Sequence, residues 1–156
     1  MYKKILVPYD KSDSAKNALQ AALDMAAGAP DATITVLSVV DWHDFNAETF
    51  RIASRMSGVL GDSMGIDAIA EVESEAVKAD TDAIAENIAP LVGDANCVEI
   101  AVVNGSPHDS ITAYADEGDY DCIVMGHRGL GAVRSMLGSV CYSVLHKTNI
   151  PVLIVK

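Results

Sequence analysis

Short apolar runs alternate along this chain with longer stretches in which apolar residues recur every three to four positions. The short runs are rich in Val and Ile and are typical of buried strands, whereas the longer stretches are typical of amphipathic helices. The pattern predicts strands at residues 3–9, 33–40, 97–103, 121–125 and 151–155. It predicts helices at residues 14–27, 67–91, 107–117 and 138–147.

Strands that alternate with helices predict parallel pairing with right-handed crossovers. The expected fold is therefore α/β: a doubly wound, five-stranded parallel sheet with helices on both faces. The 156 residues suffice for one domain, so we expect a single domain over residues 1–156. Residues 41–66 fit neither pattern, and we interpret them as a partly helical insertion.

Charge limits the partners that this fold can have. The chain has 22 acidic and 11 basic residues, a net charge of -11. Such a surface repels the phosphates of nucleic acid and of anionic lipid, so we expect neither nucleic acid nor a membrane as a partner. The acids of the 67–91 helix are interpreted as a solvated helix face. Because the overall charge repels phosphate, a small ligand that carries phosphates would need backbone hydrogen-bond donors in its immediate surroundings.

The three cysteines indicate the compartment. Cys97, Cys122 and Cys141 are far apart and odd in number, which is typical of reduced thiols and not of a disulfide or zinc set. No apolar run reaches the length that spans a membrane, and the start of the chain leads directly into a strand. We therefore expect a cytoplasmic protein.

The segment after the 121–125 strand carries the clearest chemical signal. Ligands of doubly wound sheets bind beyond the carboxyl ends of the strands, and Gly126-His-Arg-Gly129-Leu-Gly131 places three glycines there. Glycine lets backbone amides approach phosphate, and Gly138-Ser139 opens a helix whose free N–H groups attract anions. Arg128 supplies a nearby cation. The loop is predicted to cradle phosphates, and a side chain at Gly126 is expected to occupy phosphate space without disturbing the fold.

Several blocks, in order, resemble the universal stress protein family. They are Tyr2-Lys-Lys-Ile-Leu-Val-Pro-Tyr-Asp10 with Ser12, Val39-Val-Asp41, Gly105-Ser-Pro-His108, Asp121-Cys-Ile-Val-Met-Gly126, Gly138-Ser-Val140 and Pro151-Val-Leu-Ile-Val155. The ATP-binding branch of that family is marked by Gly-x-x-Gly, a spacer, and Gly-Ser/Thr. Here these are Gly126, Gly129, Gly138 and Ser139, with a spacer of eight residues, 130–137, where the family commonly has roughly nine.

The resemblance implies a ligand and a role for each matching residue. ATP is the implied ligand, with AMP and ADP as alternatives, and Mg²⁺ would be held mainly by the phosphates. Asp10 and Val39 would flank the adenosine, and Pro8 would shape the end of the first strand. The residues implied to line the ribose and phosphates are Met125, Gly126 and Gly129, and those implied to bind phosphate at the helix start are Gly138, Ser139 and Val140. A homodimer through strand 151–155 is implied as well.

Alternative interpretations exist for three residues. Asp10 could cap the first helix or bridge the turn, and Ser139 could be only an early helix residue. His127 could contact phosphate, but we interpret it as an exposed loop histidine without a partner. A hydrolase is not expected, because there is no Gly-x-Ser-x-Gly elbow and no serine with an evident histidine and acid. A response regulator is not expected either, because Asn104-Gly105 follows the third strand where a phosphorylatable aspartate is needed.

The expected function is that of an ATP-binding, nucleotide-sensing regulatory protein of the stress response. A slow ATPase using the same loop is one alternative, and a dimeric scaffold without nucleotide is the other. The sequence shows no general base beside the phosphates, which argues against fast turnover.

Overall fold

The computed structural model describes residues 2–40, 65–130 and 137–156, with side chains of the 65–92 helix from residue 73 onward. Five strands form one sheet in which every pairing is parallel, in the order β3-β2-β1-β4-β5. The strands are β1 Lys4–Pro8, β2 Thr33–Val40, β3 Val98–Asn104, β4 Cys122–Gly126 and β5 Val152–Val155. The predicted sheet is confirmed. The predicted insertion at 41–66 lies outside the described residues, except for the first two residues of the next helix.

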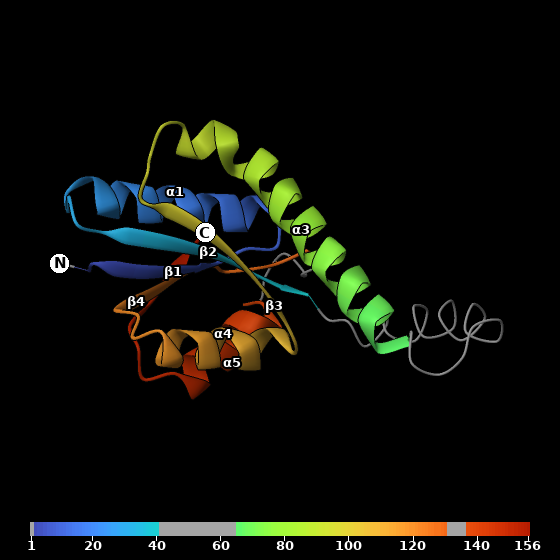
Figure 1. Ribbon diagram of the computed structural model, residues 1–156. Coiled ribbons are helices and arrows are strands. Elements are labelled where there is room, and N and C mark those ends of the chain that lie inside the picture. Colours follow the sequence, from blue (N-terminus) through green and yellow to red (C-terminus); the bar gives the residue numbers. More distant parts are fainter. Residues whose placement is uncertain (1, 41–64, 131–136) are drawn as a thin grey trace.

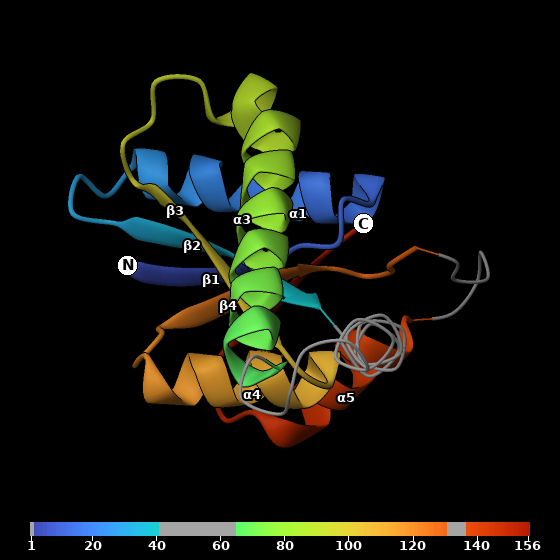
Figure 2. The same ribbon diagram turned by 45° about the vertical axis from the view of Figure 1, so that its right-hand side comes forward.

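Four described helices cover the two faces of the sheet. They are α1 Asp13–Ala27, α3 Gly65–Val92, α4 Pro107–Glu117 and α5 Ser139–Lys147. In Figure 1 α1 and α3 lie on one face, and α4 and α5 on the other. Figure 2 shows α3 lying across the strands, where it packs against β3 and α1. None of the described helices combines the length and the apolar character needed to cross a membrane.

Local sequence explains where the helices begin. Ser12 is the N-cap of α1, and its Oγ accepts a hydrogen bond of 3.2 Å from the amide of Ala15. Pro107 opens α4, where its missing N–H costs nothing because the first amides of a helix have no intrahelical acceptor. Gly138 precedes α5 and offers no side chain to cap it. The amides at the start of α5 therefore need another acceptor.

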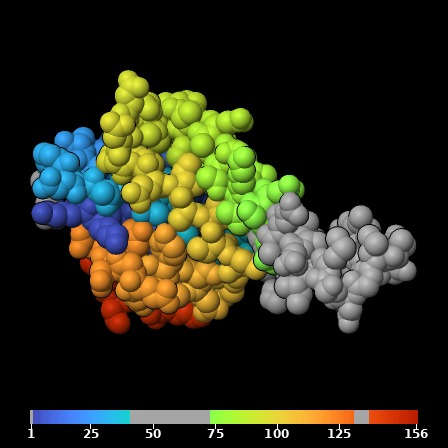
Figure 3. Space-filling model, in the orientation of Figure 1, coloured from blue at the N-terminus to red at the C-terminus, as the bar shows by residue number. Residues whose placement is uncertain are grey.

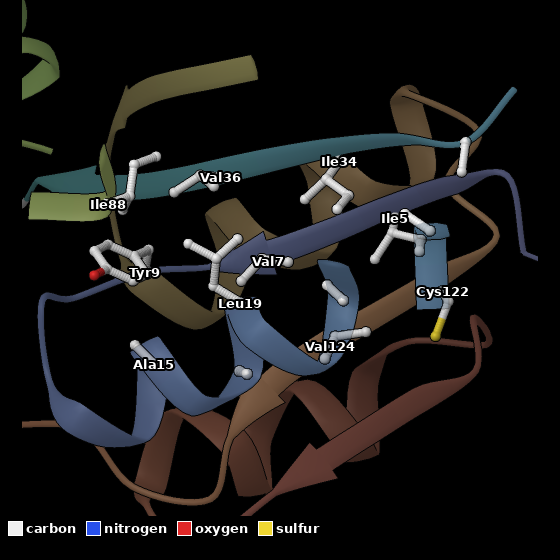
Figure 4. Close-up of a cluster of buried hydrophobic side chains, with 14 of the residues drawn as sticks. Ile5, Val7, Tyr9, Ala15, Leu19, Ile34, Val36, Ile88, Cys122 and Val124 are labelled. Atoms are coloured by element: carbon white, nitrogen blue, oxygen red, sulfur yellow. The ribbon is translucent and has the colours of Figure 1, made fainter. Parts of the chain in front are cut away.

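Both faces of the sheet are buried, which is why the strands are apolar throughout. Ile5 and Val7 of β1 pack on one face with Leu19 of α1 and Ile88 of α3 (Figure 4). Leu6 points to the other face and packs in the cluster that includes residues of α4 and α5. Full burial of such a side chain contributes about 1.5–3 kcal/mol. Figure 3 shows the edge strand β3 (yellow) at the surface between α3 (green) and α4 (orange).

The strand order decides where a ligand can enter. The chain runs from β1 outward through β2 to β3, and then crosses to the other side of β1 to form β4 and β5. The order therefore reverses between β1 and β4. In open parallel sheets the crevice beyond the carboxyl ends at such a reversal is where ligands bind.

Candidate functional site

A pocket of about 510 Å³ lies at the carboxyl ends of β1, β2 and β4. Nine of the ten predicted site residues line it: Pro8, Asp10, Val39, Met125, Gly126, Arg128, Gly129, Gly138 and Val140. The tenth, Ser139, begins α5 between two lining residues. Three neighbouring strands and the start of α5 thus bring together residues that lie up to 132 positions apart in sequence, from Pro8 to Val140.

One end of the pocket is suited to an anion. Arg128 lines it, and the Nε of Arg128 is buried without a hydrogen-bond partner among the described residues. A buried, unsatisfied donor costs about 1–3 kcal/mol, so it marks a place for an acceptor. The uncapped start of α5 lies at the same end, because the amide of Gly138 donates a 2.8 Å hydrogen bond to the carbonyl of His127. Helix amides and a guanidinium together favour a phosphate group.

Gly126 is required by packing and not only by ligand space. A Cβ built on it would lie 2.6 Å from Ser14 Oγ and 2.7 Å from the backbone carbon and oxygen of Ser14. The end of β4 therefore approaches the backbone of α1 too closely for any side chain. The expectation that a side chain at Gly126 would leave the fold intact is wrong.

Asp10 bridges the turn after β1 and also holds the loop after β4. Its Oδ1 accepts a 3.0 Å hydrogen bond from the amide of Ser12, and its Oδ2 accepts one of 3.1 Å from the amide of Leu130. The cap of α1 is Ser12 and not Asp10. A Cβ on Gly129 would lie 2.5 Å from Asp10 Oδ2, so the glycine leaves room for this carboxylate. Asp10 thus fixes the pocket's rim while lining the pocket itself.

His127 has partners, contrary to the interpretation of an exposed and unpartnered loop histidine. It is partly buried, and its Nδ1 lies 3.1 Å from both Ser14 Oγ and the carbonyl oxygen of Val155. Its amide also donates to the same carbonyl at 2.8 Å. The side chain therefore joins α1, the end of β4 and β5, and it is not among the residues that line the pocket.

An ion pair that the sequence analysis missed lines the opposite end of the pocket. Lys11 Nζ lies 2.8 Å from Asp80 Oδ1, and Ser38 Oγ donates a 2.8 Å hydrogen bond to Asp80 Oδ2. Asp80 is on α3, among the acids interpreted as a solvated face, yet its side chain is only 21% exposed. The spacing of Asp80 could have predicted this position. Asp80 precedes the buried Ile84 and Ile88 at intervals of four residues, and so it lies on the same side of the helix.

Tyr9 adds a second link between the pocket and α3. Its hydroxyl donates a 2.6 Å hydrogen bond to Asn87 Oδ1. Burial, and to a lesser extent the neighbouring Asp10, raise the pKa of Tyr9, so the hydroxyl keeps its proton at neutral pH. Within residues 2–40, 65–130 and 137–156, no three His, Cys, Asp or Glu side chains are placed to hold a metal ion.

A serine, a histidine and an acid do meet at the start of α4, which the sequence analysis did not expect. Ser106 Oγ lies 3.3 Å from His108 Nδ1, and His108 Nε2 lies 3.3 Å from Asp109 Oδ2. A hydrogen bond from Lys147 is the main cause that lowers the pKa of Asp109. None of these residues lines the pocket, and the Asp109 carboxylate also pairs with Lys147, so the cluster is separate from the candidate site.

Comparison with known proteins gives a consistent result over the whole chain. The model of the universal stress protein family matches residues 1–156. Universal stress protein MJ0577 of Methanocaldococcus jannaschii is 31% identical over 158 residues, covering 100% of this chain and 96% of that protein. Its solved structure aligns over 100% of this chain and 96% of its own, with a TM-score of 0.70 and 28% identity.

Two further solved structures contain nucleotides. One is a universal stress protein in complex with cAMP, which has a TM-score of 0.58 and 25% identity and covers 99% of this chain and 96% of its own. The other is the universal stress protein from Archaeoglobus fulgidus in complex with dAMP, which has a TM-score of 0.58 and 25% identity and covers 99% of this chain and 98% of its own.

Proposed function

The chain belongs to the universal stress protein family, and on this premise we propose that its pocket binds an adenine nucleotide and that the protein is a nucleotide-sensing regulator of the stress response. The observation that carries the proposal is the buried, unpartnered Nε of Arg128 beside the uncapped start of α5. The complexes of two relatives with cAMP and dAMP support the same ligand class. ATP is the proposed ligand, with AMP and ADP as alternatives.

The polarity of the pocket supports one orientation of the ligand. The phosphates would lie at the end formed by Arg128, Gly129 and the start of α5. There the Nε of Arg128 has no hydrogen-bond partner among the described residues. The base would lie against the apolar lining toward β2, which includes Leu37 and Val39. Mg²⁺, if bound, would be held mainly by the phosphates, because no three His, Cys, Asp or Glu side chains of the described residues are placed to hold it.

Titration calorimetry tests this proposal. We expect AMP, ADP and ATP, the last with and without Mg²⁺, to bind the purified protein with millimolar or tighter affinity. No binding heat with any of them at millimolar ligand would overturn the proposal and favour a scaffold without nucleotide. Phosphate release above the buffer rate in the same samples would favour the slow ATPase. Mass spectrometry of the freshly purified protein checks independently for co-purified nucleotide.

We also propose a homodimer in which β5 pairs with its copy. β5 is an edge strand of the sheet, and Leu153 at its centre is 40% exposed. An edge strand offers unpaired backbone groups, and an exposed leucine there favours pairing with another strand. The proposed location is the cytoplasm, because all three cysteines are free thiols.

A further inference from the structure

The Lys11–Asp80 pair lies at the end of the pocket away from the phosphate-binding features. Ser38, which holds Asp80, is on β2, whereas Arg128 and α5 follow β4. Since β1 separates β2 from β4, these two ends are roughly 10 Å apart, two strand spacings. A carboxylate repels phosphate and attracts N–H groups. The end of the pocket at Asp80 therefore suits the base of a nucleotide, which carries N–H donors, better than the phosphates.

Asp80 is held in place from two other elements. Ser38, which is 8% exposed on β2, donates to one carboxylate oxygen, and Lys11 after β1 pairs with the other. Lys11 has a φ of +66°, a backbone conformation that is uncommon for residues other than glycine. Strained backbone of this kind often occurs at ligand sites, where the surroundings enforce it. The carboxylate is therefore preorganised.

The carboxylate of Asp80 still has acceptor capacity toward the pocket. A carboxylate can accept about four hydrogen bonds, and Lys11 and Ser38 supply one each. Asp80 and Lys11 both line the pocket, so a bound base can reach the pair. A donor on the base edge would be attracted to Asp80, and a carbonyl oxygen in the same place would be repelled.

We propose that Asp80 determines base specificity by accepting a hydrogen bond from the exocyclic amino group of the base, so that the pocket selects a 6-aminopurine over a 6-oxopurine. This rests on the proposed nucleotide binding and adds a residue that reads the base. Lys11 and Ser38 are positioning residues that fix the carboxylate. A site built to hydrogen-bond one group rejects the analogue that lacks it, because the protein group then stays unsatisfied.

Calorimetric affinities for AMP and IMP test the proposal, because these ligands share the ribose and phosphate and differ at position 6 of the base. We expect the wild-type protein to bind AMP roughly tenfold more tightly than IMP. Asp80→Asn keeps the size of the side chain but removes its charge, and it should reduce the ratio to about threefold or less. Asp82→Asn, at an exposed position two residues further along α3, is the matched control and should keep the wild-type ratio.

Ser38→Ala provides a second variant that leaves both charges of the ion pair in place. It should also reduce the AMP-to-IMP ratio, because the carboxylate loses the hydroxyl that orients it. Circular dichroism verifies that each variant is folded. A wild-type ratio in folded Asp80→Asn, or equal binding of AMP and IMP by the wild type, would overturn this proposal alone. Binding of neither nucleotide by the wild type would overturn the proposed function with it.

Discussion

Gly126 at the end of β4 and Ser14 in the first turn of α1 are in such close contact that a Cβ on the glycine would lie 2.7 Å from the serine backbone. Backbone atoms of a helix cannot move aside as the end of a flexible side chain can. Gly126 therefore serves the packing of α1 on the sheet as well as the pocket that it lines.

Gly126→Ala should therefore destabilise the protein by about 1–3 kcal/mol, the usual cost of overpacking. Gly138→Ala is the matched control, because its Cβ would lie 3.4 Å from its nearest described neighbours, an ordinary contact distance. We expect this control to cost less than about 1 kcal/mol. Urea unfolding of both variants measures the difference. Equal stability of Gly126→Ala and the wild type would contradict the contact with Ser14.

Arg128→Gln should weaken the binding of AMP about tenfold while leaving adenosine affinity unchanged. The guanidinium is expected to serve the phosphate alone, and a hydrogen bond to a charged group is worth about 1.5–3 kcal/mol. Lys78→Gln is the control, because it removes one positive charge at an exposed position on α3 that does not line the pocket. It shows how far the change in net charge alone affects AMP binding. Calorimetry with both ligands is the measurement. An equal loss for adenosine and AMP would place Arg128 outside the phosphate site.

The stability of the fold should depend on the ionisation of Asp121. Amides of Lys3 and Lys4 donate hydrogen bonds of 2.8 and 2.9 Å to its Oδ2, and these bonds lower the pKa of Asp121 below its usual value. The unfolded chain then binds a proton at Asp121 more readily than the folded protein does. The stabilisation of the fold by the ionised carboxylate is therefore complete above the ordinary aspartate pKa of about 4. It is lost as the pH falls through the lower pKa of the folded state.

Asp121→Asn keeps an acceptor oxygen and loses the charge, so its deficit in stability against the wild type should be largest at pH 7 and shrink toward pH 3. Urea unfolding at several pH values measures this deficit. Asp31→Asn, at an exposed position beside β2, is the control and should show little deficit at any pH. A deficit for Asp121→Asn that stays constant with pH would show that charge is not the cause.

Leu153→Glu should convert the proposed homodimer into a monomer. The side chain is 40% exposed in the single chain, so the substitution should leave the fold intact, while two glutamates facing each other across paired edge strands would repel. Sedimentation velocity at micromolar concentration measures the state of both proteins. A wild-type monomer, or a dimer that persists in Leu153→Glu, would exclude pairing through β5.

The three cysteines should differ in reactivity. Cys122 and Cys141 are only 1% and 2% exposed, and burial raises the pKa of both thiols, whereas Cys97 is partly exposed. Iodoacetamide at pH 8 should therefore add one label to the native protein and three in urea, because only an accessible thiolate reacts. Intact mass spectrometry counts the labels. More than one rapid label on the native protein would show that a buried thiol becomes exposed.

The sequence determined the elements and the general place of the site. Each strand is a continuous run of β-branched and other apolar residues because both faces of a parallel sheet are buried, and such runs are legible locally. The glycines after the fourth strand and at Gly138 indicated the pocket's position, since the carboxyl ends of parallel strands meet at one edge of the sheet. The ordered blocks that resemble the universal stress protein family then predicted ten site residues, nine of which line the pocket.

Only the tertiary structure decided which residues meet across that edge. Lys11 and Asp80 are 69 positions apart, and Ser14 and His127 are 113 apart, so no local pattern pairs them. Their contacts depend on how α1 and α3 pack on the sheet, which side-chain shape and close packing set. For that reason an acid interpreted as part of a solvated helix face lies in the pocket, and a glycine assigned to phosphate space also packs against a helix.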